Sequence, residues 1–299
     1  MSNSASCGRV IAMAQKIILV TGGAGFIGSH LCERLAKDGH RVISLDNYFT
    51  GSRDNHVAGV EYREGHTKDV AKHIPETPDL VYHLGEYSRT AVAKEEPEVV
   101  WDLNILGTLG VLEFCRAKKA KLVYAGSSTK FADAREDGTD GRNLSPYTWA
   151  KAANSELVEN YGLWYGLPHA IVYFYNVYGP RELSGRYGTV VEIFRQNYLK
   201  GEPLKVNGPG TQTRTYTHVL DTVEALVAVG ERGEGDEYGI ASEDTYSTRA
   251  VAELFGGIIE MMPPRKTSRP SSPTDTTKTR ALGWTPNYTL KEYVRSIKQ

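Results

Sequence analysis

Tyr147 and Lys151 lie four residues apart in the segment YTWAK. In a helix, this spacing places both side chains on one face. A tyrosine phenol has an ordinary pKa of about 10, and a neighbouring ammonium group favours the phenolate, which can accept a proton near neutral pH. The same spacing also arises by chance on solvated helix faces. Ser127, Ser128 and Thr129 end an earlier strand-like run, and a hydroxyl there could share a substrate hydroxyl with Tyr147. The residues therefore predict proton transfer at a hydroxyl group.

A glycine-rich stretch, TGGAGFIG, follows the apolar run 16–20 and precedes a helix-like pattern. It satisfies the spacing G-x-G-x-x-G at Gly23, Gly25 and Gly28. Glycines allow a tight turn and the close approach of a pyrophosphate, and the amino end of a helix offers free N–H groups to that anion. Glycines also form ordinary turns, but the strand before and the helix after favour a dinucleotide-binding loop.

Asp46 ends the second strand-like run, roughly 20 residues after the glycines, where a ribose-binding carboxylate is expected. A carboxylate there can accept hydrogen bonds from both adenosine ribose hydroxyls and would repel a 2′-phosphate. The sequence therefore favours NAD over NADP. The alternative is an aspartate that only forms the turn before Asn47.

Strand-like and helix-like patterns alternate through the first half of the chain. The expected strands are 16–20, 40–46, 60–64, 79–85, 121–127 and 169–177, and the expected helices are 26–37, 98–117 and 147–165. This alternation predicts an α/β fold, a Rossmann-type doubly wound parallel sheet with right-handed crossovers.

Glycine and proline interrupt the chain often after Gly179-Pro180, which predicts a smaller, loop-rich C-terminal substrate domain. The expected division is a flexible tail at 1–15 and an NAD-binding Rossmann domain at 16–175 with a return segment near 214–241. Residues 176–213 and 242–299 form the second domain.

The composition excludes several classes of protein. The 299 residues carry 35 Lys and Arg against 36 Asp and Glu, a net charge of −1, which gives no electrostatic footprint for nucleic acid or an anionic membrane. The three cysteines, Cys7, Cys32 and Cys115, are widely spaced, which fits a reducing, cytoplasmic location. His218 and Asp221 lie three apart, but no third ligand converges, so we expect no metal site.

Several motifs together resemble one known family. They are TGGAGFIGSHL, LDN, VYHLG, NILGT, SPYTWAKAANSE, YFYNVYGP, TQTRTYTHVLD and ALGWTPNYTL, and they cover nearly the whole chain from Lys16 onward. The sequence resembles the extended short-chain dehydrogenases/reductases, in particular the NAD-dependent nucleotide-sugar epimerase/dehydratase group, whose best-known member is UDP-galactose 4-epimerase.

The resemblance implies a role for each matching residue. The catalytic residues would be Ser127, Tyr147 and Lys151. The residues implied to bind or line NAD are Gly22, Gly25, Phe26, Ile27, Asp46, Asn47, Leu84, Gly85, Asn104, Lys151, Tyr175 and Val177. The residues implied to bind the nucleotide sugar, a UDP-sugar by preference, are Ser127, Ser128, Tyr147, Asn176, Arg214 and Arg269, the two arginines through the diphosphate.

The chain departs from the family pattern at several positions. Glu86 stands where the family usually has a small residue after His-Leu-Ala, and His66 replaces an aspartate that often touches the adenine. Glu86 could serve as a substitute acid, but we expect a structural salt bridge to Arg89 instead.

The resemblance implies that C4 of the sugar is first oxidised to a 4-keto group while Tyr147 takes the O4 proton. The keto sugar could be reduced on its other face, lose water across C5–C6, or leave. Dehydrating relatives carry Asp and Glu directly after the catalytic hydroxyl residue, whereas this chain has Ser128 and Thr129. We therefore expect a C4 epimerase, with a 4-dehydrogenase/reductase or a 4,6-dehydratase as alternatives. The intact catalytic set argues against a non-catalytic NAD-binding sensor.

By analogy with the family, the helices near 98–117 and 147–165 could pack across the two-fold axis of a homodimer.

Overall fold

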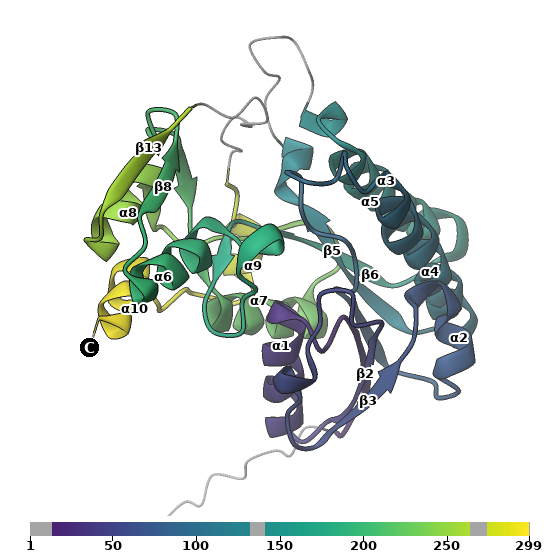
Figure 1. Cartoon of the computed structure of the whole chain (residues 1–299). Coiled ribbons are helices and arrows are strands. Elements are labelled where there is room, and N and C mark those ends of the chain that lie inside the picture. The colour runs from purple at the N-terminus through teal and green to yellow at the C-terminus, as the bar shows by residue number, and fades with distance from the viewer. Residues whose placement is uncertain (1–13, 132–140, 264–273, 299) are drawn as a thin grey trace, which may run out of the picture.

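The computed structural model describes residues 14–131, 141–263 and 274–298 (Figure 1). A seven-stranded parallel sheet in the order β11-β6-β5-β4-β1-β2-β3 forms the larger part. Its strands are β1 (Ile17–Thr21), β2 (Arg41–Asp46), β3 (Val60–Glu64), β4 (Leu80–His83), β5 (Lys121–Ser127), β6 (His169–Phe174) and β11 (Gly235–Ile240). The predicted Rossmann-type fold class is confirmed.

Alternate residues of each central strand point into opposite layers of helices. Ile18 and Val20 of β1 join the core under α1 (Phe26–Lys37) and α7 (Val219–Arg232), whereas Leu19 joins the core under α4 (Gly107–Lys118) and α5 (Pro146–Tyr165). The apolar run of β1 is thus buried on both faces, as a central parallel strand requires. Figure 1 shows α1 and α7 on one side of the sheet and α4 and α5 on the other.

The predicted helix at 98–117 is wrong in its details. The segment consists of α3 (Pro97–Val100), a π-helical stretch at Trp101–Leu106 and α4. The predicted strand 79–85 stops at His83, so Leu84, Gly85 and Glu86 leave the sheet as a loop. The predicted strand 169–177 ends at Phe174, and a second short strand, β7 (Val177–Tyr178), follows a left-handed Asn176 with φ 36°.

Over the described residues, the smaller part contains three two-stranded sheets and three helices. Besides β7, its strands are β8 (Leu204–Asn207), β9 (Thr213–Thr215), β10 (Thr217–His218), β12 (Thr245–Ser247) and β13 (Ile259–Met262), and its helices are α6 (Val190–Lys200), α8 (Thr248–Phe255) and α10 (Leu290–Ile297). Phe194, Leu204 and Phe255 lie in its apolar core. The chain returns to the large sheet through α7 and β11. The division into two domains stays a prediction.

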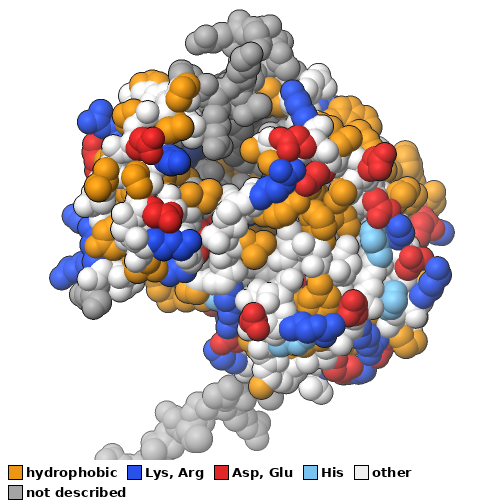
Figure 2. Space-filling model, in the orientation of Figure 1, with side chains coloured by type: hydrophobic (Ala, Val, Ile, Leu, Met, Phe, Trp, Pro, Cys, Tyr) orange, Lys and Arg blue, Asp and Glu red, His pale blue; other side chains and the backbone are white. Residues whose placement is uncertain are grey.

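The remaining helices are short connectors. They are α2 (Val70–His73), α9 (Thr277–Ala281) and 3₁₀ turns at Arg53–Asn55, Thr67–Asp69, Ser128–Phe131, Gly141–Asn143 and Gly185–Tyr187. Within the described ranges, no helix combines the length and the apolar character needed to cross a membrane. Acidic and basic side chains alternate over the face shown in Figure 2.

Candidate active site

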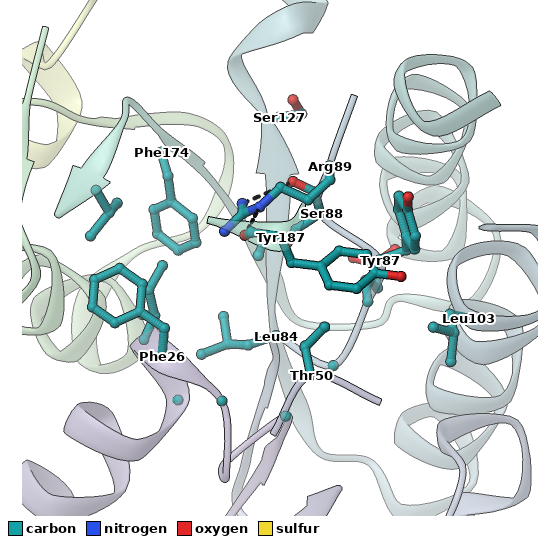
Figure 3. Close-up of a pocket in the computed structure, with 18 of the residues that line it drawn as sticks. Phe26, Thr50, Leu84, Tyr87, Ser88, Arg89, Leu103, Ser127, Phe174 and Tyr187 are labelled. Atoms are coloured by element: carbon teal, nitrogen blue, oxygen red, sulfur yellow. Dashed lines mark hydrogen bonds between the residues drawn. The ribbon is translucent and has the colours of Figure 1, made fainter. Parts of the chain in front are cut away.

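A cavity of about 350 Å³ opens at the carboxyl end of the large sheet, next to the smaller part (Figures 2 and 3). The ends of β1, β2, β4 and β5 supply much of its lining, as expected for ligand sites of doubly wound sheets. The predicted site residues that line it are Gly22, Gly25, Phe26, Ile27, Asp46, Asn47, Leu84, Gly85, Ser127, Ser128, Tyr147, Lys151, Asn176 and Val177. Packing thus gathers residues that lie up to 155 positions apart in the sequence.

The glycine loop forms one wall of this cavity. Gly22 has a φ of 73°, and a Cβ there would lie 2.8 Å from the backbone nitrogen of Gly85, so only glycine fits between the two loops. Gly25 is the N-cap residue of α1, and no side chain caps the first N–H groups of that helix. These N–H groups at a bare helix end suit the pyrophosphate of a dinucleotide.

Asp46 holds the glycine loop and also lines the cavity. Its Oδ2 accepts a hydrogen bond from the Ala24 backbone nitrogen at 2.9 Å, and its Oδ1 accepts one from the Tyr48 nitrogen at 2.8 Å. Burial raises the pKa of Asp46, although both hydrogen bonds act in the opposite direction. Asp46 therefore both stabilises the turn at Tyr48 and lines the cavity, so the two roles considered for it do not exclude each other.

Helix α5 presents Tyr147 and Lys151 to the cavity one turn apart. Its amino end is fixed by a capping box, in which the Thr148 nitrogen donates to Ser145 Oγ at 3.2 Å and the Ser145 nitrogen donates to Thr148 Oγ1 at 2.9 Å. Tyr147 is 9% exposed, and Lys151 Nζ donates to the Ala125 carbonyl at 2.6 Å. The buried helix start holds both groups where a ligand in the cavity would meet them.

The expected salt bridge between Glu86 and Arg89 is wrong. Glu86 forms a buried ion pair with Lys151, and the two side chains are 1% and 5% exposed. The loop after β4 turns Glu86 inward toward α5, whereas Arg89 donates to the Tyr187 and Ser88 carbonyl oxygens. Sequence proximity favoured Arg89, but the tertiary fold brings the lysine to the carboxylate.

Three residues implied for the site do not line the cavity. Asn104 is fully buried behind it, where its side chain accepts from the Tyr87 nitrogen at 2.8 Å and donates to the Tyr87 carbonyl at 3.1 Å. Tyr175 lies in the core under α4 and α5. Arg214 lies on β9 and is not among the lining residues, although its neighbour Thr215 accepts a hydrogen bond from the lining residue Asn176 at 2.8 Å. The expectation for Arg269 falls outside the described residues.

Other lining residues carried no predicted role in binding or catalysis. They include Phe49, Thr50, Tyr87, Ser88, Arg89 and Tyr187, most of them labelled in Figure 3. The rings of Phe49, Tyr87 and Tyr187 pack edge to face or tilted, with centroids 5.5 to 6.3 Å apart. The unusual segment EYSR after His-Leu-Gly was the available signal for Tyr87 and Arg89. Phe49 lies in a loop and Tyr187 ends a 3₁₀ turn, and neither segment carries a sequence motif.

Titratable groups near the cavity respond strongly to burial. Burial lowers the pKa of His83 to about 4, so its ring is neutral near pH 7. Burial raises the pKa of Glu182 to about 7, although the Thr189 nitrogen donates to its Oε1 at 3.0 Å. His218 caps the start of α7, and no cluster of three or more potential metal ligands occurs within the described ranges.

A profile of the NAD dependent epimerase/dehydratase family matches residues 18–241. The chain is 34% identical over 257 residues to the UDP-N-acetyl-alpha-D-glucosaminuronate decarboxylase of Bacillus cytotoxicus, covering 80% of this chain and 79% of the relative. This chain belongs to the NAD-dependent epimerase/dehydratase family.

Two solved members of this family are similar over most of their length. The UDP-glucose 4-epimerase of Thermotoga maritima, solved with UDP-glucose, has a TM-score of 0.85 and 29% identity, covering 94% of this chain and 97% of that one. The UDP-glucose 4-epimerase of Thermus thermophilus, solved with NAD, has a TM-score of 0.84 and 33% identity, covering 94% and 98%. The chain is therefore an NAD-dependent enzyme that modifies nucleotide sugars.

Proposed function

We propose that this enzyme is a C4 epimerase of a nucleotide sugar, preferably a UDP-sugar. The observation that carries the proposal is that Tyr147, Lys151 and Ser127 line one cavity together with the glycine loop and Asp46. A base, a cation and a hydroxyl group thus lie beside the dinucleotide elements. The similarity to two 4-epimerases supports the same reaction.

In the proposed mechanism, NAD supplies the chemistry of taking a hydride from C4 of the sugar and returning it to the opposite face. Tyr147 accepts the proton of the O4 hydroxyl as the carbonyl forms, and it returns that proton at the end. Lys151 stabilises the phenolate and holds the nicotinamide ribose, and Ser127 orients the sugar hydroxyl.

The remaining residues bind rather than react. We propose Gly22, Gly25, Phe26 and Ile27 for the pyrophosphate of NAD, Asp46 and Asn47 for its adenosine ribose, and Leu84, Gly85 and Val177 for the walls of its site. Asn104 and Tyr175 support this site from behind. Ser128 and Asn176 contact the sugar in this proposal, and Arg214 and Arg269 hold the diphosphate.

Dehydration is the weaker alternative because it needs an acid and a base near C5–C6 of the sugar. Ser128 lines the cavity and is 2% exposed, but a hydroxyl cannot act as a tuned carboxyl group does. A 4-dehydrogenase would release a keto product and a reductase would release a reduced product, and each would consume added cofactor. An epimerase instead regenerates its cofactor in every turnover.

Replacing Tyr147 by Phe tests the mechanism. The purified protein is incubated with UDP-, GDP-, dTDP- and CDP-sugars without added NAD, and NMR follows the configuration at C4. We expect the C4 epimer with the native protein and a loss of turnover of 10³-fold or more, roughly the scale of losing a general base with its oriented proton, in Tyr147→Phe. NAD should remain bound.

The matched control is Tyr161→Phe, on the same helix, whose hydroxyl donates to Glu113 at 2.6 Å and lies outside the cavity lining. It should keep native turnover. Full activity of Tyr147→Phe, or a keto product from the native protein, would contradict the epimerase mechanism.

A second candidate is a reaction on a nucleotide hexuronate. Arg89 lines the cavity, and within the described ranges its guanidinium donates only to two backbone carbonyls, so it could receive a sugar carboxylate. The Bacillus relative is named as a decarboxylase. UDP-hexuronates therefore belong in the panel, because carbon dioxide release and a pentose product would distinguish decarboxylation from epimerisation.

We further propose that the enzyme is a cytoplasmic homodimer. The described cysteines, Cys32 and Cys115, are buried free thiols, which supports a reducing compartment. The region from Trp101 into α4, together with the start of α5, exposes large apolar side chains, and the rings of Trp101 and Trp149 meet edge to face at 5.7 Å. Such a surface suits a second copy of the chain.

A further inference from the structure

The buried carboxylate of Glu86 is the most densely bonded side chain beside the cavity. Its Oε1 accepts hydrogen bonds from Thr108 Oγ1 at 3.0 Å, Asn154 Nδ2 at 3.1 Å and the Tyr124 hydroxyl at 3.2 Å. Its Oε2 accepts from Lys151 Nζ. Every one of these partners donates, which is the environment of an ionised carboxylate.

The bonding continues from Glu86 to the glycine loop. Thr108 gives its hydroxyl proton to Glu86, so it must accept from His83 Nε2, which lies 3.1 Å away. His83 is neutral, and its Nδ1 therefore accepts from Thr21 Oγ1 at 2.7 Å. Thr21 Oγ1 in turn accepts from the Gly85 nitrogen at 3.1 Å. The chain of bonds thus ties Lys151 to the loop that would hold the pyrophosphate.

An ammonium group favours the phenolate form of a neighbouring tyrosine more strongly when it is alone than when a carboxylate is paired with it. A lone charge on Lys151 would favour the phenolate of Tyr147 fully, whereas the carboxylate of Glu86 cancels part of that field. Among the described residues, the other titratable groups that face this cluster include His83 from β4 and Tyr124 from β5, both neutral near pH 7, and Tyr87, whose ring lies 6.5 Å from that of Tyr147. Arg89 is charged, and its charge also acts on Tyr147.

We propose that Glu86 is a positioning residue for Lys151, and that it sets the pH at which Tyr147 becomes an effective base. The carboxylate holds the ammonium group in one place, against the Ala125 carbonyl, and offsets its charge. Turnover should therefore begin at a higher pH than in an enzyme with the lysine alone. This inference rests on the proposed function, in which Tyr147 takes the O4 proton.

The test is the pH dependence of Glu86→Gln, which keeps the shape of the side chain and removes its charge. We expect the acid side of the kcat profile to move to lower pH by about one unit, the scale of removing one partly screened charge. Glu86→Ala, in which a water can replace the carboxylate, should shift in the same direction and serves if the glutamine variant does not fold. The matched control is Glu113→Gln, a carboxylate on α4 outside the cavity lining, which should leave the profile unchanged.

A second measurement separates this inference from the proposed function. The tyrosinate absorbance of each protein is titrated against its Tyr147→Phe counterpart, and the difference reports Tyr147 without requiring turnover. We expect the difference curve to move to lower pH when Glu86 is replaced. An unmoved curve, or one that moves to higher pH, in a folded variant that binds NAD would overturn the role of Glu86. Activity of Tyr147→Phe would instead overturn the proposed mechanism, and with it the role of Glu86 in turnover, whereas the difference curve would still report whether Glu86 acts on Tyr147.

Discussion

At the scale of single residues, two buried carboxylates have contrasting surroundings: Glu86, which lines the cavity, and Glu182, which precedes the lining residue Leu183. Glu86 has four hydrogen-bond donors, whereas Glu182 is 8% exposed and receives one backbone N–H at its Oε1. Within the described ranges, its Oε2 has no hydrogen-bond partner. A carboxylate buried with few donors resists ionisation, which is why the pKa of Glu182 rises to about 7.

Glu182 should make stability depend on pH. Between the ordinary pKa of about 4.5 and the folded value of about 7, the unfolded chain has lost the proton while the folded chain keeps it. Stability therefore falls as the pH rises through this window, and the full penalty is present above it. We expect Glu182→Gln to raise the free energy of unfolding at pH 8 by about 3 kcal/mol and to change it little at pH 4.5, measured by urea denaturation.

The control for this prediction is Glu192→Gln. Glu192 is equally buried, at 4% exposed, but Arg195 and Gln196 donate to it, so its replacement should give no gain at pH 8. A gain for Glu182→Gln that is the same at both pH values would argue against the titration of this side chain.

At the scale of elements, the amino end of α5 and the π-helical stretch position the site. The extra residue of a π turn rotates Asn104 inward, where it bonds both backbone groups of Tyr87 and fixes the loop after β4. The capping box fixes the turn of α5 that carries Tyr147. The π turn and the capping box thus position cavity residues by fixing the backbone segments that carry them.

Ser145→Ala tests whether the cap of α5 affects turnover in addition to the stability of the fold. The loss of the N-cap should cost about 1 kcal/mol of stability and lower turnover, because Tyr147 lies in the first turn of α5. Thr289→Ala is the matched control, since Thr289 caps α10, far along the chain, by accepting from the Glu292 nitrogen. It should lose similar stability and keep native turnover. Equal effects of both variants on turnover would show that the cap of α5 has no special role in the site.

At the scale of the whole molecule, residues of both parts line the cavity, and several large apolar side chains of the large part remain partly exposed. Trp101, Leu106, Leu109 and Trp149 are each about two fifths to one half exposed. Apolar side chains grouped in this way mark an interaction surface more often than a solvated one.

We expect the native protein to sediment as a dimer and Leu109→Arg to sediment as a monomer, because a charge on the apolar face cannot be buried without a partner. Analytical ultracentrifugation at micromolar concentration measures both. The control is Ile258→Arg, which alters an exposed apolar side chain on the smaller part and should leave the dimer intact. A native monomer, or a dimer that tolerates Leu109→Arg, would contradict the proposed interface.

The sequence by itself determined the local features of this protein. The double-sided apolar strands, the glycine loop, Asp46 and the pair of Tyr147 and Lys151 follow from residue types and short spacings. The strands form the core, and Gly22, Gly25, Asp46, Tyr147 and Lys151 line the cavity. These features are readable because strand burial, helix starts and one-turn neighbours depend on nearby residues alone.

Only the tertiary structure decided the partners of charged groups and the irregular backbone. Glu86 meets Lys151, 65 residues away, rather than Arg89, three residues away, because the fold buries the carboxylate between β5, α4 and α5. The π turn at Asn104 and the aromatic wall of Phe49 and Tyr187 likewise arise where packed elements meet. Burying a charge is costly unless the whole packed structure supplies its partners, so no local pattern can reveal which partner it will have.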